Sequence, residues 1–235
     1  MTTLYPQVVS CVICGAENEC TFLGSTNSFG SPDLDYRPAG MARYTLIYEV
    51  QTCVNCGFSA PAISDDFKEY LTKIKTGQKE QLNKIKEIIA SKEYKELLNN
   101  EFFPDFSNSF LASSCILEKI GNYNSAFFMA MKSAWIADDN DNINAAQYSR
   151  NKALKLLDRT TDDFIDNSTR LLLKIELLRR TARFEEAEKL INQALIELQS
   201  DENATQLITY QNRLIYKKDT AVHKIDEGMM VWIIW

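Results

Sequence analysis

The stretch CVICG, residues 11–15, returns as CVNCG at residues 53–57. These two copies hold four of the six cysteines of the chain, and each copy places a glycine directly after its second cysteine. Two intervening residues let both thiolates of a C-x-x-C turn point at one ion, and glycine suits the open backbone that follows. The pattern predicts one metal site with four thiolate ligands: Cys11, Cys14, Cys53 and Cys56.

Zinc is the metal we expect, one structural ion per chain, because four thiolates form the closed tetrahedral arrangement of structural zinc sites. Iron is the alternative, since rubredoxins also hold their metal between two C-x-x-C-G turns and thiolates alone do not distinguish the two metals. Two redox-active or disulfide-bonded pairs are a third interpretation. A closed site leaves no coordination position for water, so we expect it to support folding rather than catalysis.

The composition of residues 1–62 favours turns and short strands, and together with the paired cysteine turns it predicts a small β module of the zinc-ribbon type. The stretch RYTLIYEVQT, residues 43–52, alternates in the manner of a strand, and ECTFLG, residues 19–24, predicts a shorter partner strand. Between them lies loop material rich in Gly, Ser, Pro and Asp. The module is acidic, with five acidic and two basic side chains: Glu17, Glu19, Asp33, Asp35 and Glu49 against Arg37 and Arg43.

Helical periodicity replaces this pattern from residue 63 onward. Phe67, Tyr70, Leu71 and Ile74 follow the i, i+3, i+4, i+7 spacing of one helix face. Breaks at Gly, Pro and Asp-rich points delimit further predicted helices at 105–120, 124–138, 142–159, 167–181, 184–199 and 203–225. The sequence therefore predicts a mainly α protein with two domains, the β module over 1–62 and an all-α domain over 63–235.

Two stretches of the helical part resemble each other, IGNYNSAFFMAMKSA at 120–134 and TARFEEAEKLINQAL at 181–195. Both place an aromatic residue three positions before an alanine at the start of a helix: Tyr123 before Ala126, and Phe184 before Ala187. An alanine there lets two helices approach closely, as in tetratricopeptide hairpins. The two copies do not follow the period of about 34 residues, so we predict irregular tetratricopeptide-like hairpins.

Charge and hydropathy argue against nucleic acid partners, secretion and a membrane span. A net charge of −6 opposes attraction to nucleic acid phosphates. The first residues lack the features of a secretory signal, and the longest apolar run, MMVWIIW at 229–235, is too short to span a bilayer, so we expect a cytoplasmic protein. We expect this tail to pack against its own chain; a homodimer contact, a partner-binding role and a shallow membrane contact are the alternatives.

Three stretches together resemble the bacterial family called domain of unknown function 2225: CVICG, PDLDYRP at 32–38, and RYTLIYEVQTCVNCGFSA at 43–60. The resemblance implies a zinc-ribbon-like segment joined to tetratricopeptide-like helices, with the four cysteines as metal ligands. It marks Asp33, Asp35 and Arg37 as a family feature, for which a local ion pair that orders the loop is one interpretation and a recognition loop the other.

No residue pattern for catalysis accompanies the cysteines. The only histidine, His223, has no nucleophilic signature around it. We therefore expect a non-enzymatic, zinc-binding protein that acts as an adaptor or scaffold for a protein partner. The alternative is a rubredoxin-like iron protein or a thiol redox protein that uses the same four cysteines.

Overall fold

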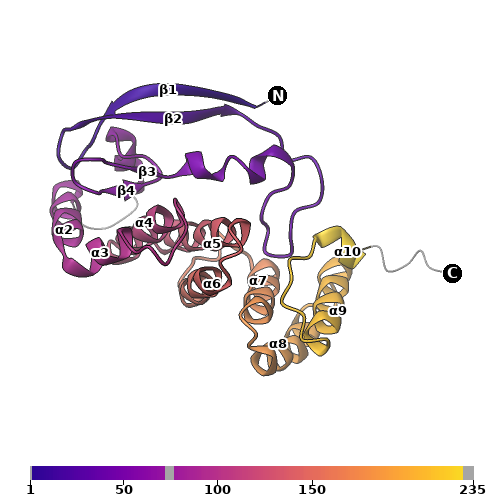
Figure 1. The fold of residues 1–235 in the computed structure, drawn as a ribbon. Coiled ribbons are helices and arrows are strands. Elements are labelled where there is room, and N and C mark those ends of the chain that lie inside the picture. The colour runs from indigo at the N-terminus through magenta and orange to yellow at the C-terminus, as the bar shows by residue number, and fades with distance from the viewer. Residues whose placement is uncertain (1, 72–76, 230–235) are drawn as a thin grey trace. The chain divides into compact units, whose positions relative to one another are not determined.

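The computed structural model describes residues 2–71 and 77–229, and it is mainly helical, as predicted (Figure 1). The chain forms two compact units. The first unit contains Met1–Asn27 and Tyr44–Arg159, and the second contains Ser28–Arg43 and Thr160–Trp235. The predicted domain boundary near residue 62 lies inside the first unit, and the proposal that 1–62 is a separate module stays a prediction.

The described part of the first unit contains two small antiparallel sheets. Strand β1 (Thr3–Ser10) pairs with β2 (Glu17–Ser25), and β3 (Gln51–Thr52) pairs with β4 (Ser59–Ala60). The predicted strand at 19–24 is confirmed within β2.

The longer strand predicted at 43–52 is wrong over most of its length. The chain there forms the short 3₁₀ helices η1 (Gly40–Arg43) and η2 (Leu46–Glu49), and only Gln51 and Thr52 are extended. Leu46, the first residue of η2, and Val50, which follows η2 in an extended conformation, are both buried. The 3₁₀ turn therefore keeps inside the same two apolar side chains that strand alternation would have buried.

The other regular elements among the described residues of the first unit are helices. They are η3 (Asp65–Phe67), α1 (Lys68–Leu71), α2 (Gln78–Ala90), α3 (Lys92–Leu98), α4 (Ser107–Lys119), α5 (Tyr123–Asp139) and α6 (Ile143–Leu157). Ile74, part of the predicted helix face, lies outside the described residues. Three fully buried serines join α4, α5 and α6, with hydroxyl oxygens 2.8 Å apart for Ser107 and Ser133 and 2.9 Å apart for Ser133 and Ser149. Each hydroxyl thereby keeps a partner in an apolar interior.

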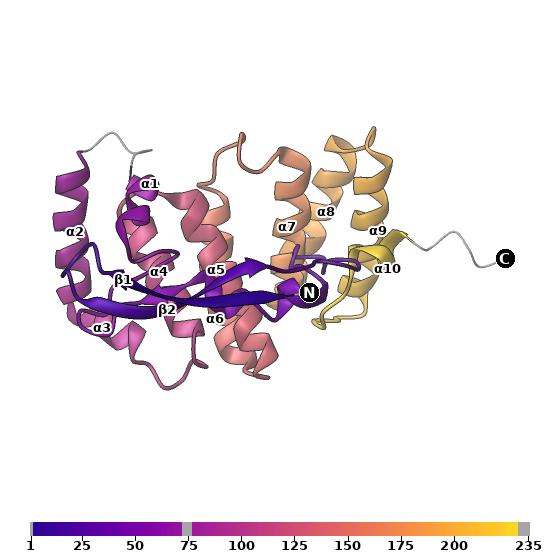
Figure 2. The same cartoon turned by 90° about the horizontal axis from the view of Figure 1, so that it is seen from above.

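The second unit contains α7 (Asn167–Arg180), α8 (Phe184–Glu197), α9 (Glu202–Tyr216) and α10 (Ile225–Met229) (Figure 2). The predicted helix at 203–225 is too long, because α9 ends at Tyr216. The fully buried Arg179 donates to the backbone carbonyls of Asp219 and Ala221, which holds the following segment in a non-helical path.

The two stretches that resemble each other each begin a helix that packs back on its predecessor. Ala126 of α5 and Ala187 of α8 are completely buried, as close helix packing requires. The α4–α5 and α7–α8 hairpins are present. Their assignment to a tetratricopeptide-like class stays a prediction.

None of the described helices is both long and apolar enough to cross a lipid bilayer. The apolar tail begins at Met229, the last residue of α10, and its remainder, 230–235, lies outside the described residues. Its predicted roles in packing, in a homodimer or in partner binding therefore stay predictions.

Candidate metal centre

The four cysteines of the two repeated turns lie together in the first unit. All four Sγ atoms are within 4.8 Å of one another. The Sγ atoms of Cys11 and Cys56 are 3.8 Å apart, and those of Cys14 and Cys53 are 3.6 Å apart. A tetrahedral ion with metal–sulfur bonds of about 2.3 Å places its ligands roughly 3.8 Å apart. The cluster therefore fits a four-thiolate metal ion, and the geometry suits zinc and iron alike.

The two turns have the same backbone hydrogen bonds. In the first turn, the amide of Cys11 donates to the carbonyl of Ala16 (2.9 Å) and the amide of Gly15 donates to the carbonyl of Cys11 (2.8 Å). The second turn repeats both bonds at matching positions and distances. Gly15 and Gly57 have φ angles of +76° and +73°, the left-handed region that glycine enters at little cost. The repeated glycine thus has a conformational role in each turn.

Two asparagines that the sequence reasoning missed contact the sulfurs. The buried Asn18, on β2, donates to Sγ of Cys53 (3.6 Å) and accepts from the amide of Val54 (2.9 Å). Asn55 donates to Sγ of Cys14 (3.5 Å). Hydrogen bonds to ligand sulfurs orient them and stabilise their negative charge. Asn55 lies inside the second C-x-x-C turn, which is a signal that could have indicated its role, whereas nothing in the sequence marks Asn18.

The second turn is also tied to the helices. The buried hydroxyl of Tyr94, on α3, donates to the carbonyl of Gly57 (2.8 Å) and accepts from the amide of Ser59 (3.2 Å). Thr52 of β3 donates to the hydroxyl of Ser109 on α4 (3.0 Å). The cysteine cluster therefore joins the first cysteine turn to the second, and α3 and α4 hold the second turn in place.

The thiols differ in their acidity without a metal. Burial raises the pKa of Cys11 to about 11 and also raises that of Cys56. The hydrogen bond from Asn55 lowers the pKa of Cys14 to about 6, and Cys14 is exposed. A divalent ion would compensate the charge of all four thiolates, which burial opposes in its absence.

The remaining cysteines lie elsewhere. Cys20 is half-buried on β2 and Cys115 is half-buried on α4, and burial raises the pKa of both thiols. His223 lies in the second unit between α9 and α10, with Nε2 3.1 Å from Oδ2 of Asp219 and Nδ1 2.7 Å from Oε2 of Glu227. In the part of the chain that the structure describes, no hydrogen bond or ion pair joins His223 to a cysteine.

The loop that carries Asp33, Asp35 and Arg37 belongs to the second unit, and all three side chains are buried. Asp33 pairs with Arg43, with a shortest N–O distance of 2.6 Å. The amide of Arg37 donates to Oδ1 of Asp35 at 3.3 Å, an Asx-type bond. Burial raises the pKa of Asp33, which its contact with Arg43 partly offsets.

The same loop pairs with the segment that precedes α10. The amide of Leu34 donates to the carbonyl of His223 (2.8 Å), and the amide of Ile225 donates to the carbonyl of Pro32 (2.9 Å). Asp33 and Lys224 form an isolated β-bridge. These bonds and the ion pair order the loop within the second unit.

The fold and the cluster define a class of protein: a helical chain with a small N-terminal sheet beside four cysteines that could hold one metal ion. The chain belongs to the family described as an uncharacterized protein conserved in bacteria, domain of unknown function 2225, whose model matches residues 4–217. No curated protein and no solved structure matches the chain.

Proposed function

We propose that this is a non-enzymatic, cytoplasmic protein that holds one structural zinc ion and acts as an adaptor for a protein partner. The observation that carries the metal role is the closed group of four thiols within 4.8 Å. A four-sulfur site that joins two chain segments contributes its binding free energy to folding. The link through Tyr94 favours the same role, because it couples the cluster to α3.

The adaptor role draws support from exposed apolar side chains on the helical part of the first unit. Phe102 and Phe106 precede α4, and Ile143 and Tyr148 lie on α6; all four are exposed. The rings of Phe102 and Phe103 are 5.3 Å apart, and Phe103 is 5.3 Å from Tyr148, so the aromatic contacts continue from the surface to the core. Exposed aromatic and aliphatic side chains of this kind are frequent at protein-binding surfaces, and Phe102 and Tyr148 are joined through Phe103.

The metal role is tested by elemental analysis of the full chain, purified without chelators, beside its visible spectrum. We expect one zinc ion per chain, lost in Cys53→Ser and retained in Cys115→Ser. One iron ion per chain, with thiolate charge-transfer bands in the visible spectrum, would instead indicate an electron-transfer protein.

The adaptor role is tested by comparing the proteins that co-purify with two matched variants. Ile143 is 71% exposed and Ile196 is 72% exposed, so Ile143→Ser and Ile196→Ser remove the same group from equally open positions. We expect a partner that stays with the native chain and with Ile196→Ser and is lost with Ile143→Ser. Identical sets of proteins from both variants would contradict a role for this surface.

A redox role for the same cysteines is the second candidate. The lowered pKa of Cys14 and its exposure favour it, because an accessible thiolate is the reactive form of cysteine. Metal-free protein in which the four clustered cysteines are free thiols with a reversible potential would support this candidate over the structural site.

A further inference from the structure

The outer edge of strand β1 has the features of a site for β-strand addition. Figure 1 shows β1 as the outer strand of its sheet, and β2 is its pairing partner. Strand β2, on the other side of this hairpin, contacts the η2 turn. An unpaired strand edge presents amide and carbonyl groups to a further strand, and proteins usually guard such edges with charged residues. β1 contains no charged residue, and Pro6 is its one typical guard.

The direction of the amide groups identifies the donors at this edge. The amide of Cys11 donates toward β2, to Ala16, whereas the next amide, that of Val12, donates to the carbonyl of Ile63. Since amides alternate along a strand, Ser10 and Val8 point to the same side as Val12. Pro6 is the next residue whose backbone nitrogen points away from β2. Because proline has no amide hydrogen, its presence there removes no hydrogen bond between β1 and β2. Among the described residues, no backbone acceptor is recorded for the amides of Val8 and Ser10.

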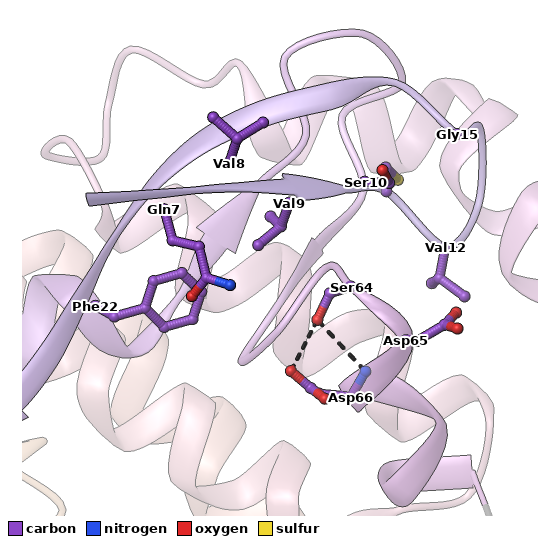
Figure 3. A pocket seen from close by; sticks show the side chains of 11 residues that line it. Gln7, Val8, Val9, Ser10, Val12, Gly15, Phe22, Ser64, Asp65 and Asp66 are labelled. Carbon is purple, nitrogen blue, oxygen red and sulfur yellow. Dashed lines mark hydrogen bonds between the residues drawn. The ribbon is translucent and has the colours of Figure 1, made fainter. Parts of the chain in front are cut away.

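Ile63 thus occupies the place where an added strand would begin, and the chain then turns away at Ser64. The departure leaves a cavity of about 560 Å³ beside β1. Gln7, Phe22 and Ser64 are among its lining residues (Figure 3). In the same figure, Val8 points to the opposite side of the strand.

The cavity wall opposite β1 is acidic. Asp65 and Asp66 line it, both exposed at the surface. Asp65 contacts Lys68 (2.8 Å), and Asp66 accepts from the hydroxyl of Ser64 (3.0 Å). A strand added to β1 would direct alternate side chains to the face of Gln7, toward these carboxylates, where a lysine or arginine is complementary.

We propose that the edge of β1 binds an extended peptide of a partner protein, with β-forming residues around a lysine or arginine that enters the cavity. Backbone bonds to Val8 and Ser10 supply affinity, and the acidic wall supplies selectivity. A second copy of β1, TLYPQVVS, has no basic side chain and does not meet this requirement. The inference rests on the proposed binding function and names one surface and one partner chemistry for it.

The test is selection of a random octapeptide library against the full metal-bound chain, followed by affinity measurements on variants. Val8→Pro removes one edge amide, and Val8→Thr is the matched control that keeps it. Val8 is 61% exposed, so neither change disturbs a packed core. We expect selected peptides rich in β-branched residues with a basic residue at one position. Their affinity should fall at least tenfold with Val8→Pro, stay unchanged with Val8→Thr and become less dependent on salt with Asp66→Asn, which leaves Asp65 in place.

A second measurement needs no variant. Amide hydrogen exchange at Val8 and Ser10 in the native chain should slow when a selected peptide is added. The proposal is overturned when no peptide family is enriched, when selected peptides lack a basic position, or when both amides exchange at unchanged rates. Ile143→Ser leaves the β1 edge intact, so loss of the adaptor role and loss of peptide binding are separate results.

Discussion

Single residues around the cysteines determine how the site is held. Asn18 makes three contacts from a buried position, to Cys53, to Val54 and to the carbonyl of Ala16 (2.8 Å). Asn55 makes its sulfur contact from the surface. The two asparagines have different effects: Asn18 orients the ligands, and Asn55 increases the acidity of the Cys14 thiol.

Asn55→Ala should raise the pKa of Cys14 from about 6 toward its ordinary value of 9.0, because the largest stabilising contact of the thiolate is removed. The rate of alkylation by iodoacetamide in metal-free protein should then reach its midpoint at higher pH. Val54→Ala, at the neighbouring exposed position, is the control and should leave the midpoint unchanged. An equal midpoint in the native chain and Asn55→Ala would mean that another group sets the acidity of Cys14.

At the scale of elements, several helices in both units end in one recurrent turn. After α4 the amide of Asn122 donates to the carbonyl of Leu117, and after α7 the amide of Arg183 donates to that of Leu178. These are the bonds of a Schellman motif, which requires one left-handed residue between the helices. Gly121 fills that position in the first case with φ +88°, and Ala182 fills it in the second with φ +58°.

Ala182→Gly should therefore raise the free energy of unfolding by about 1 kcal/mol, since alanine carries a left-handed strain that glycine lacks. Gly121→Ala is the reverse change in the equivalent turn and should lower it by about 1 kcal/mol. No atom lies within 4 Å of a Cβ added at Gly121, so its effect comes from the backbone alone. Urea unfolding followed by helical circular dichroism measures both. A loss of stability with Ala182→Gly would contradict this account.

At the scale of the whole molecule, the chain enters the second unit twice, at Ser28–Arg43 and again from Thr160. The four cysteines flank the first entry in sequence, yet all of them belong to the first unit. Metal binding should therefore stabilise one unit far more than the other.

Removal of the metal by a chelator should speed amide hydrogen exchange in β1, β2 and α3, because the N-terminal turn then loses its link to the second turn. Helices α7, α8 and α9 should keep their protection. Cys53→Ser should reproduce the pattern without a chelator, and Cys115→Ser should not. Equal deprotection of both units would show that the metal acts on the chain as a whole.

The local pattern alone determined much of this protein. The repetition of the C-x-x-C-G turn indicated four clustered thiols. Each turn is a local structure, because its two thiolates and its left-handed glycine lie within five consecutive residues. Helical spacing likewise predicted α4 to α8 within a few residues, since an amphipathic period is a local property.

Tertiary structure alone decided the rest. RYTLIYEVQT alternates in the manner of a strand but mostly forms 3₁₀ turns, because burial of Leu46 and Val50 is satisfied by either conformation. The helix expected at 203–225 ends at Tyr216, where Arg179 of another helix holds the carbonyls beyond it. Asn18 at the cysteines and the open edge of β1 likewise depend on segments distant in sequence, whose contacts a local pattern does not encode.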